Sequence, residues 1–222
     1  MPVQHRWDLM PAQAIALQKE LAGQVDTTTP INLNHLKLVA GVDVSVKNNI
    51  SHAAVVVMSY PEFEILEAVT ATMPTKFPYI PGLLSFREGE VILEAHKQLQ
   101  LTPDVYIFDG MGIAHPRRLG IAAHMGLWLD RPTVGCGKTH LYGKYTEPAA
   151  ERGSMSPLTV QHKEHTEIIG MVLRTRPNVK PVYISPGNHA TVESAVELIL
   201  RCTSRYRLPE PIRAAHNTAG QF

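Results

Sequence analysis

The chain has 222 residues, of which 44% are hydrophobic and 18% are charged, and its formal net charge is +1. These values are typical of a globular protein with one large core, so we expect a single domain over residues 1–222. The N-terminus has no signal-peptide pattern, and no apolar stretch approaches the roughly 20 residues that span a bilayer, which indicates a cytoplasmic protein with no membrane contact. The two cysteines, Cys136 and Cys202, are too few for a disulfide framework or a metal-binding knuckle, and we expect both to be buried thiols.

The first third of the chain is predicted to form one helix and three strands. Apolar residues recur at helical spacing between residues 12 and 25. Residues 36–46 show the two-residue alternation of a strand, and Asp43 interrupts its valine-rich sequence. Segments 53–58 and 63–73 predict two more strands, and the turn signals between the three indicate an antiparallel meander.

The rest of the chain alternates predicted helices and strands. A helix is expected after Ser85, and the four apolar residues Val105–Phe108 predict a buried strand. The remaining expectations are a helix from about Arg117 to Leu129, a polar loop at 145–157, strands at 133–136, 168–173 and 182–185, and a helix at 191–202. This order predicts an α/β fold with a mixed sheet, in which three antiparallel strands are followed by alternating helices and strands and the sheet is flanked by helices.

Residues 105–118 combine an acid at a strand end with a cationic patch. The predicted strand ends on Asp109, two glycines follow, and His115, Arg117 and Arg118 come just before or at the start of the next helix. A carboxylate in this position could hold a hard cation, and the cationic side chains could face phosphate. The pattern therefore predicts metal-assisted phosphate chemistry, with a simple Asp-Gly turn as the alternative.

Two other acids stand out, each with an ordinary alternative. Asp43 lies within a strand, where an unpaired buried carboxylate is costly, so either a metal or a hydrogen-bond partner is expected. Glu88 is the fourth residue of Ser85-Phe86-Arg87-Glu88, which matches a helix capping box, so Glu88 could simply cap that helix.

Several longer motifs together carry a family resemblance. The chain resembles the endonuclease V family, the deoxyinosine-specific 3′ endonucleases, over nearly its whole length. The matching motifs are Gly41-Val42-Asp43-Val44, Pro78-Tyr79-Ile80-Pro81-Gly82, Leu84-Ser85-Phe86-Arg87-Glu88, Phe108-Asp109-Gly110-Met111-Gly112, His115-Pro116-Arg117-Arg118-Leu119-Gly120, Gly137-Lys138 and Tyr206-Arg207-Leu208-Pro209-Glu210-Pro211-Ile212-Arg213. The resemblance implies a ribonuclease H-like mixed sheet.

The resemblance also implies a metal-dependent catalytic site. Asp43, Glu88 and Asp109 match the family's catalytic carboxylates and would bind Mg²⁺, for which Mn²⁺ should substitute, because Mg²⁺ favours oxygen ligands and retains waters that a phosphate can replace. Lys138 resembles the active-site lysine that binds the scissile phosphate or positions the attacking water. His216 matches a C-terminal histidine that could bind metal or assist proton transfer. Whether one or two ions act stays open.

The family pattern further implies a loop that contacts DNA and a pocket for a base. Tyr79 would act as a wedge between bases and so help extrude the damaged one. The implied DNA contacts come from Pro78, Tyr79, Ile80, Pro81, His115, Arg117 and Arg118. The implied base pocket is formed by Gly82, Leu84, Gly110, Gly120, Ile121 and Leu141.

The function implied by this resemblance is repair of deaminated adenine. The expected enzyme is a monomer that binds DNA containing deoxyinosine and hydrolyses the second phosphodiester bond 3′ to the lesion. The alternatives are an endoribonuclease directed to inosine in RNA, and a non-catalytic protein that binds inosine or branched DNA. One motif departs from the family: Ser185-Pro186-Gly187-Asn188-His189 stands where Ser-x-Gly-His is usual, which leaves the roles of Asn188 and His189 open.

Overall fold

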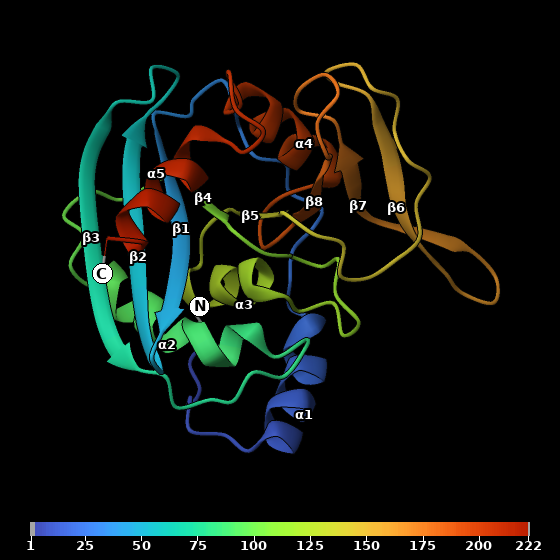
Figure 1. Cartoon of the computed structure of the whole chain (residues 1–222). Helices are drawn as coiled ribbons and strands as arrows, with labels where there is room; N and C mark the ends of the chain where they lie inside the picture. The colour runs from blue at the N-terminus through green and yellow to red at the C-terminus, as the bar shows by residue number, and fades with distance from the viewer. Residues whose placement is uncertain (1–2, 222) are drawn as a thin grey trace.

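A computed structural model describes residues 3–221, which form one mixed sheet of eight strands with helices packed on both faces (Figure 1). The strand order across the sheet is β3-β2-β1-β4-β5-β8-β7-β6. The strands are β1 (Leu38–Lys47), β2 (Ile50–Ser59), β3 (Ile65–Pro74), β4 (Val105–Phe108), β5 (Thr133–Gly137), β6 (Met155–Gln161), β7 (Thr166–Leu173) and β8 (Val182–Pro186). The helices are α1 (Pro11–Ala22), α2 (Leu84–His96), α3 (Ile121–Leu129), α4 (Val192–Arg201) and α5 (Glu210–Ala219).

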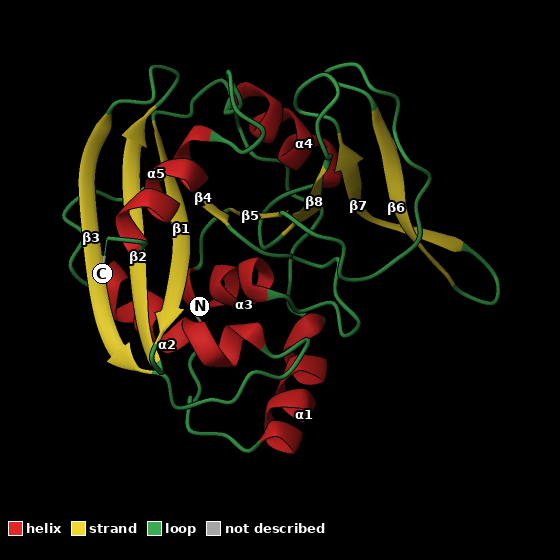
Figure 2. Ribbon diagram, viewed as in Figure 1, coloured by secondary structure: helices red, strands yellow, loops and turns green. Residues whose placement is uncertain are grey.

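The pairing of the strands confirms the predicted mixed α/β architecture. Strands β1, β2 and β3 form the antiparallel meander, while β4 runs parallel to β1 and β5 parallel to β4. Beyond β5 the pairing becomes antiparallel again, through β8 and β7 to β6 (Figure 2). The short parallel strands at the centre are buried on both faces, as their continuous apolar sequences indicate.

Alternation along β1 divides the core into two layers. Ala40 and Val42 face the cluster that contains the buried side of α2 and α3, whereas Val39 faces the cluster under α4 and α5. Gly41 lies against α5, and a Cβ there would be 1.9 Å from the carbonyl oxygen of Pro211, so only glycine allows this close approach. Helix α5 is thereby held directly over the centre of β1.

The predicted bounds of two segments were wrong. The helix expected from Arg117 begins four residues later, at Ile121, because Arg118 takes a left-handed conformation (φ 59°) that ends the preceding turn. Strand β6 occupies the end of the predicted loop at 145–157 and continues to Gln161. Its Pro157 resembles a strand breaker in the sequence, but β6 is an edge strand, where proline is tolerated.

The expected state of the cysteines is confirmed, since Cys136 and Cys202 are both free and buried. Within residues 3–221, no helix is both long enough and apolar enough to cross a membrane.

Candidate active site

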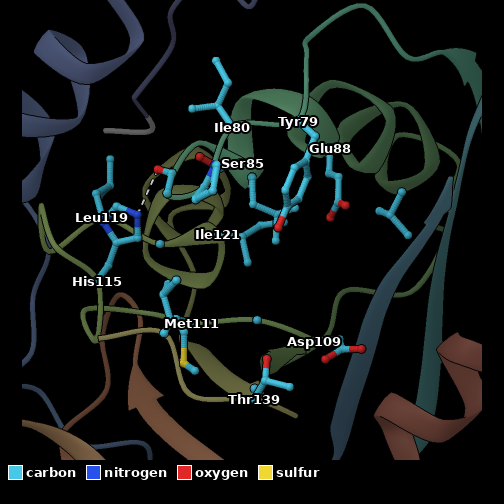
Figure 3. Close-up of a pocket in the computed structure, with 18 of the residues that line it drawn as sticks. Tyr79, Ile80, Ser85, Glu88, Asp109, Met111, His115, Leu119, Ile121 and Thr139 are labelled. Carbon is cyan, nitrogen blue, oxygen red and sulfur yellow. Dashed lines mark hydrogen bonds between the residues drawn. The ribbon is translucent and has the colours of Figure 1, made fainter. Parts of the chain in front are cut away.

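A cavity of about 460 Å³ lies where the middle of β1 and the C-terminal ends of β4 and β5 meet the start of α2 and of α3. Figure 3 shows its walls, with Glu88 on one side and Asp109 on the other. Asp43 and Lys138 also line it, as do all six residues of the expected base pocket. The structure therefore brings together motifs that are up to 100 residues apart in the sequence.

The parallel pairing of β1 and β4 sets two of the acids side by side. Val42 is paired with Phe108, so the next residues, Asp43 and Asp109, lie next to each other where β4 ends beside the middle of β1. The backbone N–H of Asp109 donates to the carbonyl oxygen of Val42 at 3.1 Å, which extends the pairing by one residue. The ends of neighbouring parallel strands are a common location for ligand sites.

His216 reaches the same place from α5. Its Nδ1 is 2.7 Å from Oδ2 of Asp43, and the side chain of Asp43 is 11% exposed whereas that of His216 is 60% exposed. Asp43, Asp109 and His216 each offer a ligand atom within 4.8 Å of the other two. Two carboxylates and an imidazole at this spacing form a donor set that fits a divalent cation.

Glu88 approaches from α2 and does not cap that helix. The N-cap of α2 is Leu83, whose side chain makes no capping hydrogen bond, so the capping-box prediction for Ser85 and Glu88 was wrong. Burial, followed by the charges of Asp43 and Asp109, raises the pKa of Glu88 to about 8, although Arg87 opposes the shift. Glu88 is thus a carboxyl group that the cavity keeps protonated at neutral pH unless a cation neutralises its neighbours.

Lys138 follows β5 and forms an ion pair with Asp109. Its backbone is held by Arg207, which donates to the carbonyl oxygen of Lys138 and also, at 2.8 Å, to that of Pro181. Burial raises the pKa of Asp109, and the ammonium group of Lys138 opposes this shift. The positive charge of Lys138 therefore partly compensates the negative charge of the acids. Its ammonium group lies where an anion that enters the cavity would contact it.

The segment from Pro78 to Pro81 forms the outer rim of the cavity. Tyr79 is 73% exposed, and Figure 3 shows its ring among the residues that line the cavity. Tyr79, Ile80 and Pro81 line the cavity, while Pro78 lines a neighbouring groove. An exposed aromatic ring fixed by two prolines is the arrangement expected of a wedge.

Helix starts form the inner wall of the cavity. Leu84, the first residue of α2, and Ile121, the first residue of α3, both line it, so the N–H groups of two helix N-termini are close to the space inside. In these first turns the N–H of Ala122 already donates to the carbonyl oxygen of Met111 at 3.0 Å and that of Phe86 to the carbonyl oxygen of Leu83 at 3.1 Å. Gly120 precedes α3, and a Cβ there would lie 2.3 Å from the carbonyl oxygen of Met111. A ligand carbonyl group would find hydrogen-bond donors at this wall.

Two of the expected DNA contacts, His115 and Arg117, hold the pocket wall. His115 is 2% exposed, its Nε2 donates to the carbonyl oxygen of Gly82 at 2.9 Å, and burial lowers its pKa to about 4. Arg117 donates to the same carbonyl oxygen at 2.8 Å and to Oε1 of Gln18. Gln18, a cavity residue that the sequence interpretation missed, donates to the carbonyl oxygens of Gly82 and Leu119, each at 3.0 Å.

Arg118 is likewise engaged within the protein. It forms an ion pair with Glu167 on β7 at 2.5 Å, and its guanidinium group lies 5.7 Å from the ring centre of Tyr142. Glu167 also contacts His162 at 2.8 Å. The β6–β7 hairpin is thus tied to the turn that precedes α3.

Asn188 and His189 lie at the opposite end of β5 from Lys138. The backbone N–H of Asn188 donates to Oγ1 of Thr133, the first residue of β5, and its side-chain oxygen accepts from the backbone N–H of Asp26 at 3.0 Å. His189 pairs with Asp26 at 3.1 Å. Asn188 and His189 thus hold the segment that follows α1 against the sheet, and neither residue lines the cavity.

Comparison with known proteins

The sheet order, the helices on both faces and the acids within β1 and at the end of β4 define a ribonuclease H-like α/β fold. The profile of the endonuclease V family matches residues 19–217, so the chain belongs to the endonuclease V family of nucleases. Among its relatives, endonuclease V of Methanothrix thermoacetophila is 47% identical over 96% of this chain and 92% of the relative. Endonuclease V of Gloeobacter violaceus is 50% identical over 96% of this chain and 86% of the relative.

Solved structures of the family share the fold over almost the whole chain. The crystal structure of endonuclease V from Bacillus subtilis superposes with a TM-score of 0.91 at 30% identity, and covers 99% of this chain and 95% of that one. Endonuclease V from Ciona intestinalis, solved in complex with a 24mer DNA containing an inosine followed by a ribo-adenosine, has a TM-score of 0.78 at 26% identity and covers 94% of this chain and 95% of that one.

Proposed function

We propose that this nuclease is a DNA repair endonuclease that recognises deoxyinosine and nicks the second phosphodiester bond on its 3′ side. The observation that supports this proposal is the continuity of one cavity: acids at one end, helix N-termini at the other and an exposed tyrosine at the rim. A deaminated adenine carries a carbonyl oxygen at C6, which the N–H groups at the starts of α2 and α3 would bind. The proposal takes residues 1–222 as one endonuclease V domain that acts as a monomer.

Asp43, Asp109 and Glu88 are the proposed metal ligands, and His216 is a further candidate. The donor set fits Mg²⁺, or Mn²⁺ in its place, because these cations prefer oxygen ligands. Burial raises the pKa of Glu88 and of Asp109, the charge of Asp43 adds to both shifts, and a bound cation would relieve that repulsion. A bound divalent cation would polarise a phosphoryl oxygen and increase the acidity of a coordinated water.

The remaining groups bind and orient the substrate in this proposal. Lys138 binds the scissile phosphate, for which it leaves Asp109, and His216 accepts or delivers a proton at Nε2 while Asp43 holds its Nδ1. Tyr79 enters the base stack beside the extruded nucleotide, and Ile80 and Pro81 hold its loop. Gly82, Leu84, Gly110, Gly120, Ile121 and Leu141 enclose the base.

In this proposal, the main role of His115, Arg117 and Arg118 is structural and is not the direct binding of phosphate. His115 and Arg117 fix the Gly82 carbonyl group, and Arg118 is paired with Glu167. Their contribution to DNA binding is therefore expected to come mainly through the shape of the pocket wall, with Arg118 available to phosphate only when Glu167 releases it.

Cleavage of inosine-containing DNA by purified protein tests the proposal. Wild type with Mg²⁺ should nick a single site beside deoxyinosine, whereas Asp43→Asn and Asp109→Asn should lose the activity and keep the fold. Lys180→Ala, a surface change outside the cavity, is the matched control and should retain the activity. Nicking that survives either acid substitution, or that requires no divalent cation, would refute the assignment of the site.

An inosine-directed ribonuclease is the second candidate function. The observation that favours it is the ribo-adenosine next to inosine in the DNA bound by the Ciona enzyme, which shows that a relative accepts a ribonucleotide at that place. Matched DNA, RNA and single-ribonucleotide substrates separate the two functions. Faster cleavage of inosine RNA than of inosine DNA would favour the ribonuclease.

A further inference from the structure

A line of hydrogen-bonded side chains connects the N-terminal segment with the wall of the cavity. Nδ1 of His5 is 2.7 Å from the carbonyl oxygen of Arg6, and Nε2 of His5 is 2.7 Å from Nε2 of His124. Nδ1 of His124 is 2.8 Å from Oγ of Ser85, which lines the cavity. Trp128 donates its indole N–H to Nε2 of His5 at 3.0 Å.

The chemistry of the two ends fixes the direction of every hydrogen bond in this line. The carbonyl oxygen of Arg6 only accepts, so Nδ1 of His5 carries a proton. The indole N–H of Trp128 only donates, so Nε2 of His5 has none. Burial lowers the pKa of His5, which favours this neutral form. His124 must therefore supply the proton between the two imidazoles, and Nε2 of His5 accepts two donors in a three-centre arrangement.

The same reasoning reaches Ser85. His124 is fully buried, and burial lowers its pKa to about 3, so its ring is neutral with one proton on Nε2. Its Nδ1 then has only a lone pair, and the hydroxyl proton of Ser85 is directed to it. The oxygen of Ser85 is left with acceptor capacity alone.

An acceptor at this wall distinguishes purines by their N1 atom. Hypoxanthine has a proton on N1 and an oxygen at C6, whereas adenine has a bare N1 and an amino group at C6. The N–H groups at the starts of α2 and α3 suit the C6 oxygen, and the Ser85 oxygen suits the adjacent N1 proton. Against adenine, the same oxygen would face the lone pair of N1.

We propose that Ser85 is a specificity-determining residue that accepts a hydrogen bond from a purine protonated at N1, and that His5 and His124 are positioning residues that fix the polarity of its hydroxyl group. This inference rests on the proposed function, because it concerns the choice of base in that same pocket. The proposal gives a role to the hydroxyl group of Ser85, which the sequence pattern had assigned to a helix cap.

The protonation states are a first test, and they require no substrate. Nitrogen-15 NMR of the free protein should show His5 with its proton on Nδ1 and His124 with its proton on Nε2. In His5→Phe, which retains an aromatic ring in this cluster, His124 loses the group that fixes its tautomer, and its spectrum should show the Nδ1-protonated form. A wild-type His124 protonated on Nδ1 would overturn the proposal.

The choice of base is the second test, measured as kcat/KM on single-stranded oligonucleotides that differ only in one base. Ser85→Ala should reduce the preference for deoxyinosine over deoxyadenosine about tenfold, as expected for loss of one hydrogen bond together with relief of a repulsion. His5→Phe should reduce it in the same direction although Ser85 is intact. Guanine shares the N1 proton and the C6 oxygen, so the preference for deoxyinosine over deoxyguanosine should stay within twofold of wild type.

Trp128→Phe is the matched control. It disturbs the same aromatic cluster, but Nδ1 of His5 stays on the Arg6 carbonyl oxygen, so the preference should be unchanged. A wild-type protein without preference for deoxyinosine would refute the proposed function itself. Two results would refute only the role of Ser85. In the first, Ser85→Ala and His5→Phe both keep the wild-type preference for deoxyinosine over deoxyadenosine. In the second, the variants lose as much preference over deoxyguanosine as over deoxyadenosine.

Discussion

Substitution of Gly41 by alanine should damage the proposed site from a position that does not line the cavity. The added Cβ would be 1.9 Å from the carbonyl oxygen and 2.2 Å from the carbonyl carbon of Pro211, and ordinary contact begins at 3.4 Å. Both contacts are with backbone, so no side-chain rotation relieves them. Strand β1 and helix α5 must separate by about 1.5 Å (3.4 − 1.9) if the overlap is to be removed by translation alone.

This separation would be transmitted to the pair of Asp43 and His216. Asp43 is two residues along β1 from Gly41, and His216 is five residues along α5 from Pro211, so their 2.7 Å hydrogen bond spans the same interface. Overpacking of this kind typically costs about 1–3 kcal/mol of stability. A displacement near 1 Å at a catalytic group reduces the rate by roughly 10²-fold.

Urea unfolding and single-turnover nicking of an inosine oligonucleotide measure these two effects separately. Gly23→Ala is the control, because a Cβ at Gly23 has no atom within 4 Å and its backbone is right-handed, so both measurements should stay near wild type. In a His216→Ala background, Gly41→Ala should reduce the rate no further. Loss of stability without loss of rate in the folded fraction would refute the link between Gly41 and the catalytic pair.

Three further predictions concern burial, the rim and the pocket wall. His124 stays neutral in the fold because burial lowers its pKa to about 3, while the unfolded chain takes up a proton below about pH 6.5. Compared with His124→Gln, wild type should therefore lose about 1.4 kcal/mol of unfolding free energy for each pH unit between about pH 6.5 and pH 3; equal pH slopes in urea titrations would contradict this. Tyr79→Ala should leave the urea midpoint unchanged, since the side chain is 73% exposed, but slow nicking of duplex DNA more than of single strands; equal slowing would exclude a wedge. Gln18→Ala should cost roughly 1–3 kcal/mol and weaken inosine binding, because the buried Leu119 carbonyl group loses a donor, whereas the Gly82 carbonyl group keeps those of His115 and Arg117; wild-type affinity in a binding titration would exclude a role of Gln18 in the wall.

The central sheet and its acids were predictable because their signals are local. Two-residue alternation predicted β1, and an apolar run bounded by a turn predicted β4; an acid that interrupts or ends such a strand has few structural explanations. The proximity of Asp43 to Asp109, by contrast, depends on the register of Val42 with Phe108, which no local pattern contains. The family resemblance supplied that proximity.

The errors arose where tertiary contacts decide the local structure. Ser85 has the sequence of a cap, but its hydroxyl group bonds His124, which lies on another helix. Gln18 could have been noticed as an amide on the buried side of α1, where it shares a face with Ala14 and Leu21. Its partners, the carbonyl groups of Gly82 and Leu119, are defined only in the folded chain.

The origin of His216 on α5 affects when the nuclease becomes complete during synthesis. Asp43 and His216 are separated by 173 positions, and α5 is the last of the described helices to leave the ribosome. A nascent chain that already contains all three acids still lacks the histidine and the helix that covers β1. Full nuclease activity should therefore first appear only after α5 has been synthesised and has packed on β1.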